Sequence, residues 1–122
     1  MARKRILLVD DEPALVGLLS IRLEANGYEV IPAADGQQAL ELARKEIPDL
    51  VILDLMLPGL DGYKVCRLLK SDEQYKQIPI MILTARAQES DKKLGEQSGA
   101  DAYIIKPFEP GFFLSKVREL IK

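Results

Sequence analysis

The feature that most constrains the fold is a regular alternation of short apolar runs with segments of helical periodicity. Five apolar runs occur, at residues 5–9, 28–33, 50–53, 79–83 and 102–105. Helical spacing of apolar residues follows each run, over about 13–26, 36–47, 62–71, 90–98 and from about 109 onward. Strands that alternate with helices need crossover connections, so we expect a parallel sheet with helices on both faces. The uninterrupted apolar character of the runs fits strands that are buried on both sides.

Length and composition indicate one domain, spanning residues 1–122, with a core that needs no disulfide or structural metal. The formal net charge of -2 gives no sign of nucleic-acid binding. Cys66 is the single cysteine, no run is long enough to cross a membrane, and the N-terminus lacks a signal-peptide pattern, so we expect a cytoplasmic protein. The chain contains no histidine, which excludes Ser-His or Cys-His catalysis, a His-containing zinc site and a phosphohistidine carrier.

Side chains that can bind ions or take part in a reaction stand directly after four of the five runs. They are, in chain order, Asp10, Asp11 and Glu12, then Asp54, Thr84 and Lys106. In open parallel sheets, sites form beyond the carboxyl ends of the strands, where the strand order reverses. With the strand order 2-1-3-4-5 of a flavodoxin-like, doubly wound (βα)5 fold, the first and third strands are neighbours. We therefore expect Asp10, Asp11 and Asp54 to converge.

Taken singly, these residues have simpler explanations. An aspartate at a strand end commonly caps a helix or forms a turn, a threonine there is usually a cap, and a lysine before proline is usually a solvated surface residue. Their conjunction favours a site, because converging carboxylates repel one another unless a cation joins them. A divalent ion or Lys106 could supply that charge.

The donor set predicts the kind of ion and the kind of chemistry. Carboxylate oxygens favour Mg2+, or alternatively Mn2+, and no soft ligand favours zinc. An incoming phosphoryl group could bind to the metal, to Lys106 and to the Thr84 hydroxyl while Asp54 acts as the nucleophile. The sequence therefore predicts a magnesium-dependent site that forms an acyl phosphate.

At this point the sequence resembles a known family, the receiver domains of two-component response regulators, which includes the bacterial chemotaxis regulator. The resemblance covers essentially the whole chain. It rests on a series of motifs in the family's order, namely Asp10-Asp11, Asp54 with Pro58 and Asp61-Gly62, Thr84-Ala85, Gly99-Ala100-Asp101, and Tyr103 with Lys106-Pro107-Phe108. Each motif alone is weak, but the ordered set is specific.

The resemblance implies a role for each site residue. Asp54 would be the phosphoacceptor. Asp11 and Asp54 would ligate magnesium directly, Asp10 would act through a water, and Met56 would contribute its backbone carbonyl.

The resemblance also implies a switch. Thr84 and Tyr103 would form the switch pair, with the Thr84 hydroxyl drawn to the phosphoryl group and Tyr103 turning inward. Lys106 would bind a phosphoryl oxygen, and the Lys106–Pro107 peptide bond is expected to be cis. The output would be a population shift on the face formed by the fourth helix, the fifth strand and the fifth helix.

The implied partners are a phosphohistidine-bearing sensor kinase or phosphotransfer protein and a downstream output domain or protein. Pairing with the kinase would depend on surface residues of the first helix, such as Leu15, Gly17, Leu18 and Arg22. No output domain fits within 122 residues, so we expect either a stand-alone regulator or one part of a longer chain, with no direct nucleic-acid binding and no membrane association by this domain.

Three positions depart from, or vary within, the family. Many DNA-binding relatives carry two acids where this chain has Asp101-Ala102, which puts their ion-paired dimer in doubt here. We expect a monomer or a weak, phosphorylation-dependent dimer. Met56 and Arg86 occupy positions where the family varies and where the lifetime of the phosphoryl group is tuned.

Three other interpretations remain open. An aspartate-nucleophile phosphatase or phosphomutase usually places a second acid two residues after the first, where this chain has Met56. A flavodoxin-like cofactor binder would need glycine or small hydroxyl residues after the first strand, where the chain has Asp-Asp-Glu. A receiver-like interaction module that is never phosphorylated would not need the complete set of site residues. The expected protein is thus a phosphoacceptor that assists only its own phosphorylation and dephosphorylation, and is not otherwise an enzyme.

Overall fold

A computed structural model describes residues 3–85 and 99–121. Within them, five parallel strands form one sheet in the predicted order β2-β1-β3-β4-β5. The strands are β1 (Arg5–Val9), β2 (Glu29–Ala33), β3 (Leu50–Asp54), β4 (Ile80–Thr84) and β5 (Ala102–Ile105). The helices are α1 (Pro13–Ala25), α2 (Gly36–Glu46), α3 (Gly62–Lys70) and α5 (Pro110–Leu120). The helix expected over 90–98 lies outside the described residues.

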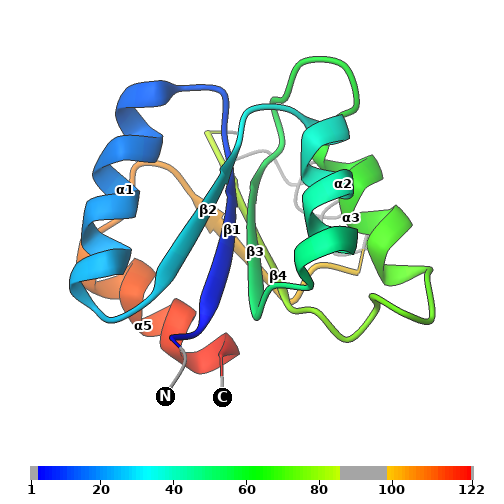
Figure 1. The fold of residues 1–122 in the computed structure, drawn as a ribbon. Helices are drawn as coiled ribbons and strands as arrows, with labels where there is room; N and C mark the ends of the chain where they lie inside the picture. Colours follow the sequence, from blue (N-terminus) through cyan, green and yellow to red (C-terminus); the bar gives the residue numbers. More distant parts are fainter. Residues whose placement is uncertain (1–2, 86–98, 122) are drawn as a thin grey trace.

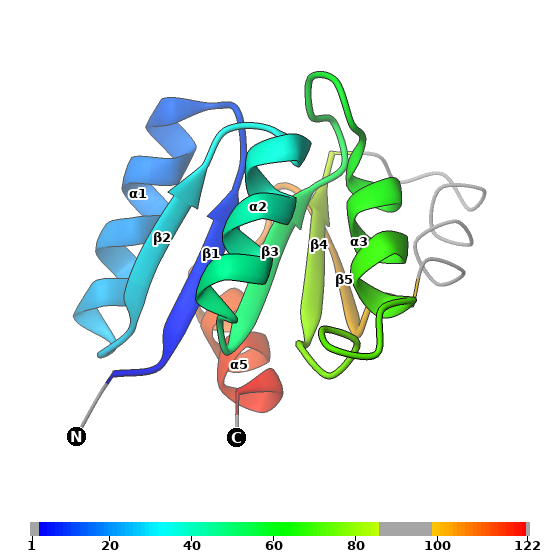
Figure 2. The same ribbon diagram turned by 45° about the vertical axis from the view of Figure 1, so that its right-hand side comes forward.

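Helices cover both faces of the sheet, with α1 and α5 on one face and α2 and α3 on the other (Figures 1 and 2). Alternate residues of each strand point to opposite faces, which divides the apolar residues between two cores. One core contains Leu7, Val51 and Ile80 together with α2 and α3 residues such as Ala39 and Leu69. The other contains Ile6, Leu50, Ile52 and Met81 with Leu19, Leu23, Phe113 and Val117 from α1 and α5. The prediction of strands buried on both sides is confirmed for β1, β3 and β4, whereas the edge strands β2 and β5 are partly exposed.

Two aspartates fix where helices begin. The Asp35 side chain accepts a hydrogen bond of 2.7 Å from the backbone N–H of Gln38 at the start of α2. The Asp61 side chain does the same at 2.9 Å from the N–H of Lys64 at the start of α3. Such caps satisfy backbone donors that lack a partner in the first helical turn.

The central strands extend one residue further than the apolar runs that predict them. Asp54 pairs with Leu83 across β3 and β4, and Thr84 pairs with Ile105 across β4 and β5. The predicted ends of these two strands lie at residues 53 and 83, where the apolar side chains stop. Hydrogen bonding between strands uses the backbone and does not depend on side-chain polarity, so the strands continue for one more residue. This extension holds the Asp54 and Thr84 side chains in sheet geometry at the edge of the site. None of the helices described in residues 3–85 and 99–121 is long and apolar enough to cross a membrane.

Candidate phosphoacceptor site

Two buried aspartates stand at the carboxyl ends of the neighbouring strands β1 and β3. Asp10 directly follows β1 and is 3% exposed, and Asp54 ends β3 and is 4% exposed. In each aspartate, one carboxylate oxygen accepts a hydrogen bond from the backbone N–H two residues later in the chain. Asp10 Oδ1 accepts from Glu12 at 2.9 Å, and Asp54 Oδ1 accepts from Met56 at 3.0 Å. These turns orient both carboxylates and leave the other oxygen of each available to a cation.

Lys106 is the basic group that compensates these charges. Its Nζ donates to Asp10 Oδ2 and to Asp54 Oδ2, at 3.2 Å in each case. The lysine is positioned by the backbone hydrogen bond of 2.7 Å from Lys106 N–H to the carbonyl of Thr84, and it precedes a cis peptide bond to Pro107, as expected. The site thus has two buried acids bridged by one ammonium group.

Burial and neighbouring charges shift the pKa values at this centre. Burial raises the pKa of Asp10, and the negative charge of Asp54 raises it further, while the Glu12 N–H and Lys106 oppose the rise. Burial lowers the pKa of Lys106, but attraction to Asp54 and Asp10 outweighs this and raises it overall. The proton is therefore held firmly on Lys106, and the lysine acts as a cation and not as a base.

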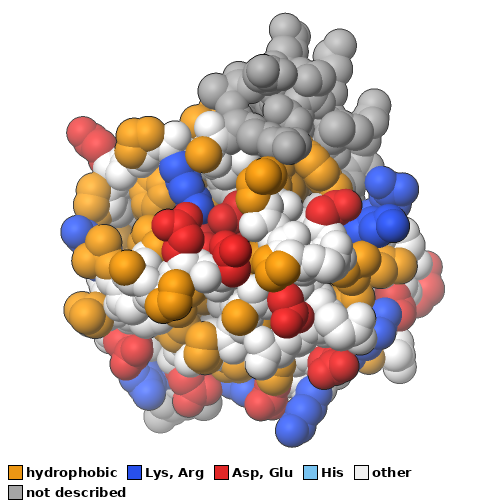
Figure 3. Space-filling view, turned by 90° about the horizontal axis from the view of Figure 1, so that it is seen from above, with side chains coloured by type: hydrophobic (Ala, Val, Ile, Leu, Met, Phe, Trp, Pro, Cys, Tyr) orange, Lys and Arg blue, Asp and Glu red, His pale blue; other side chains and the backbone are white. Residues whose placement is uncertain are grey.

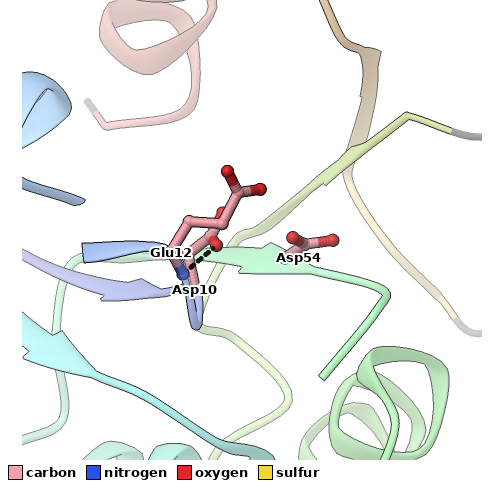
Figure 4. Close-up of side chains that lie close together, drawn as sticks. All are labelled: Asp10, Glu12 and Asp54. Carbon is pink, nitrogen blue, oxygen red and sulfur yellow. Dashed lines mark hydrogen bonds between the residues drawn. The ribbon is translucent and has the colours of Figure 1, made fainter. Parts of the chain in front are cut away.

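A third carboxylate, which was not predicted to belong to the site, lies at the same place. Ligand oxygens of Asp10, Glu12 and Asp54 fall within 4.8 Å of one another. Figure 4 shows Asp10 and Glu12 projecting from the loop after β1, with Asp54 opposite them on β3. The hydrogen bond from Glu12 N–H to Asp10 places residues 10 and 12 beside each other. A turn of this kind after Asp10 is the signal that could have pointed to Glu12.

Asp11, expected to ligate the metal directly, is not a member of this close group. Its exposed side chain lines a shallow depression between the ends of β1 and β2, together with Val16, Ala33 and Gln38. The role predicted for Asp11 remains a prediction, since it depends on a bound ion.

The predicted switch residues lie on neighbouring strands. Thr84 is fully buried at the end of β4. Tyr103 pairs with Ile82, two residues before Thr84, and packs against the α2/α3 core. Because residues two apart in a strand share a face, Thr84 and Tyr103 lie on the same side of the sheet. Met56, which lies two residues after Asp54, is 55% exposed. Its backbone contacts the site through the hydrogen bond from Met56 N–H to Asp54.

The donor set fits a hard divalent cation. Every candidate side-chain ligand in the close group is a carboxylate oxygen, and the two buried acids exceed the charge of Lys106. Oxygen donors of this kind suit Mg2+. Seen from above, acidic side chains gather near the middle of this face with a basic side chain beside them (Figure 3).

Known proteins are similar to this chain in both sequence and fold. The family model of the response regulator receiver domain matches residues 6–118. The alkaline phosphatase synthesis transcriptional regulatory protein PhoP of Bacillus subtilis (strain 168) is 48% identical over 119 residues, covering 98% of this chain and 49% of that protein. The chain thus spans about half the length of this curated relative.

Two solved structures are similar over nearly the whole chain. A putative response regulator from Chloroflexus aurantiacus J-10-fl is 38% identical, with a TM-score of 0.93 and coverage of 98% of both chains. The receiver domain of the sensor histidine kinase PA1611 from Pseudomonas aeruginosa PAO1 is 34% identical, with a TM-score of 0.91 and coverage of 98% of both chains. The latter was solved with a magnesium ion coordinated in its active site cleft.

This chain belongs to the response regulator receiver domains, and it has the fold of that class. Receiver domains are the phosphoaccepting signalling modules of two-component systems. The family interpretation drawn from the sequence is confirmed.

Proposed function

We propose that Asp54 accepts the phosphoryl group in this domain. The observation that carries the proposal is the position of Asp54 Oδ2, which lies 3.2 Å from Lys106 Nζ while Oδ1 is tied to Met56 N–H. One oxygen of a buried carboxylate is thereby oriented toward the cation that would also bind an incoming phosphoryl oxygen.

The donor is a phosphohistidine on a sensor kinase or phosphotransfer protein. In the transfer, the bond between phosphorus and the imidazole nitrogen breaks and a bond from phosphorus to an Asp54 oxygen forms. The other ring nitrogen of the phosphohistidine is protonated in the reacting donor, so the electron pair of the broken bond stays on the imidazole, which is released neutral. Lys106 stabilises the charge on the phosphoryl oxygens throughout.

Magnesium would be held directly by Asp11, Asp54 and the backbone carbonyl of Met56, with Asp10 acting through a water, as the family implies, and Mn2+ could take its place. The ion would neutralise phosphoryl oxygens that otherwise meet a largely acidic pocket. Support comes from the carboxylate donor set and from the magnesium ion in the related PA1611 receiver domain.

A groove beside the phosphoacceptor suits the donor protein. It lies between α1 and the loop that joins β5 to α5, encloses about 430 Å³, and is lined by Leu15, Leu18 and Arg22 on one side and by Lys106, Pro107 and Phe108 on the other. Lys106 belongs to both the groove and the phosphoacceptor site. A helix that carries the phosphohistidine and lies in this groove would bring its phosphoryl group to Asp54.

Phosphorylation would be transmitted through Thr84 and Tyr103 to the face that includes β5 and α5. The two residues share one side of the sheet on adjacent strands, so movement of Thr84 toward the phosphoryl group would change the space next to Tyr103. This face would then control an output domain or a partner protein. The domain accelerates only its own phosphorylation and dephosphorylation, which distinguishes it from an enzyme with external substrates.

The test is phosphorylation with a small donor. Incubation with phosphoramidate and Mg2+ should add one phosphoryl group, read by intact mass, and the group should be absent in Asp54→Asn. Asp61→Asn is the matched control, because asparagine retains the capping oxygen that Asp61 presents to Lys64. Labelling that persists in Asp54→Asn would identify another acceptor and overturn the assignment. A wild-type chain that takes no label would favour an interaction module that is never phosphorylated.

A further inference from the structure

The Glu12 side chain has an unusual combination of position and freedom. Glu12 occupies the residue before α1 where a side chain commonly caps the helix, yet it makes no capping hydrogen bond. Its backbone is engaged, because Glu12 N–H donates to Asp10 and Glu12 carbonyl accepts from Val16 N–H at 3.0 Å. Its carboxylate makes no hydrogen bond or ion pair with the residues described in 3–85 and 99–121.

That carboxylate lies at the approach to the phosphoacceptor. Its oxygen is within 4.8 Å of oxygens of Asp10 and Asp54, although the residue itself is exposed. Glu12 also lines the groove between α1 and the β5–α5 loop, alongside Lys106. Lys106 is already shared between the two buried aspartates. A phosphodonor that approaches Asp54 through this groove therefore passes an exposed negative charge that forms no ion pair with the described residues.

We propose that Glu12 is a donor-selectivity residue, which disfavours strongly anionic small phosphodonors relative to donors of lower charge. This inference rests on the proposed function of Asp54 and concerns the choice of donor only. Acetyl phosphate arrives as a dianion, whereas phosphoramidate carries one negative charge less. Because the repulsion grows with the donor's charge, Glu12 raises the barrier more for acetyl phosphate than for phosphoramidate.

The two transfer reactions differ only in the leaving group. With acetyl phosphate, the bond from phosphorus to the acetyl oxygen breaks and acetate departs with its electron pair. With phosphoramidate, the phosphorus–nitrogen bond breaks and ammonia departs, its nitrogen already protonated in the donor. In both reactions the new bond joins phosphorus to an Asp54 oxygen. A comparison between variants, made separately for each donor, thus isolates the charge met on approach from the chemistry at the acceptor.

The experiment compares Glu12→Gln with the wild type. Initial rates of Asp54 labelling are measured with each donor, at a Mg2+ concentration shown to be saturating for each variant by calorimetric titration without donor. Glu12→Gln should raise the acetyl phosphate rate constant about threefold to tenfold and the phosphoramidate rate constant by clearly less. Glu24→Gln is the matched control, since it removes the same charge from an exposed position on α1 about 18 Å away.

Salt dependence supplies a second readout that a structural effect would not change. In about 1 M salt the screening length falls to about 3 Å, so the advantage of Glu12→Gln with acetyl phosphate should disappear. Glu12→Lys should give a larger preference for acetyl phosphate than Glu12→Gln does. Equal gains with both donors, or gains that persist in high salt, would overturn the inference. A wild-type chain that neither donor labels at Asp54 would instead overturn the proposed function.

Discussion

A β carbon on Gly62 would stand 2.5 Å from the carbonyl oxygen of Asp54 and 2.9 Å from Cα of Leu55. Both obstructing atoms belong to the backbone and cannot rotate away. The close approach allows Gly62 N–H to donate to the Leu55 carbonyl at 3.3 Å, so that α3 begins directly against the end of β3. Gly62 is therefore needed for the packing of α3 against the end of β3, behind Asp54.

Gly62→Ala should lower the free energy of unfolding by about 1–3 kcal/mol, because the added methyl group forces the helix away from β3. Urea denaturation measures the change. The matched control is Gly17→Ala on α1, where no neighbouring atom lies within 4 Å of the place that the methyl carbon would take. There alanine should raise stability by up to about 1 kcal/mol through its helix propensity. Equal effects at both glycines would show that contact with Asp54 is unimportant.

Lys106→Met should destabilise the magnesium-free protein by about 2–3 kcal/mol. The lysine side chain is 16% exposed and bridges two nearly buried carboxylates, which would otherwise repel each other without compensation. Added Mg2+ should restore part of the lost stability, because it binds the folded state and supplies positive charge at the same place. Thermal unfolding with and without Mg2+ measures both effects.

Lys116→Met is the control for the loss of a lysine. Its ion pair with Glu119, at 3.4 Å, joins two side chains that are 37% and 64% exposed. Such a pair contributes about 0–1 kcal/mol, and Mg2+ should not affect the variant differently from the wild type. If Lys106→Met and Lys116→Met behaved alike, the bridging role of Lys106 would be contradicted.

Asp10→Asn should stabilise the magnesium-free protein at neutral pH. The pKa of Asp10 is raised above its ordinary value of 3.8, chiefly by burial, so the folded state holds the proton more tightly than the unfolded state does. The contribution of Asp10 to stability is then fully present below about pH 3.8 and is lost as the pH rises through the raised pKa. Asparagine does not ionise, so the variant keeps this stability as the pH rises.

Urea denaturation at several pH values should show the advantage of Asp10→Asn shrinking as the pH falls toward 3.8. An advantage that is independent of pH would point to packing instead of ionisation. The exposed Asp61, replaced by asparagine, serves as the control for a change of one carboxylate elsewhere.

The fold was predictable because its determinants are local and repeated. Continuous apolar runs, the helical spacing between them and the stops at Asn26-Gly27 and Pro48 each indicate an element without reference to the rest of the chain. Parallel pairing then follows from the alternation of elements. Pro48 indicates the end of α2 at Glu46, but nothing in the sequence indicates that Ile47, the residue between them, adopts a left-handed conformation with φ of 44°, where glycine is the usual residue.

The site was predictable in its buried part. Asp10, Asp54 and Lys106 follow strands whose register the sheet fixes, so their convergence is a consequence of topology. Glu12 and Asp11 stand in a loop, where orientation depends on a turn closed by one hydrogen bond to Asp10. Strand periodicity does not extend into such a loop, and the order of residues alone did not indicate which side chain lies beside Asp54.

Lys70 anchors the start of β5, at the end of the sheet opposite Asp54. Its Nζ lies 2.8 Å from Asp101 Oδ2 and donates to the carbonyls of Ile78 at 2.8 Å and Lys76 at 3.1 Å. The same Asp101 oxygen accepts from Ile80 N–H at 2.8 Å, which joins β4 to the residue just before β5. Asp101, noted in the sequence as part of a family motif, thus has a structural role in this chain.

Lys70→Met should lower the free energy of unfolding by about 2–3 kcal/mol, because it leaves a carboxylate and two carbonyls without their shared donor while the lysine side chain is only 16% exposed. Lys76→Met is the matched control, since its pair with Glu73 is formed by side chains that are 47% and 86% exposed. Loss of that pair should cost less than about 1 kcal/mol. Hydrogen exchange adds a local readout, in which Lys70→Met should weaken protection of the Ile80 and Asp101 amides more than that of the β1 amides. Uniform loss of protection across the sheet would show that Lys70 supports the whole fold and not the β4–β5 junction in particular.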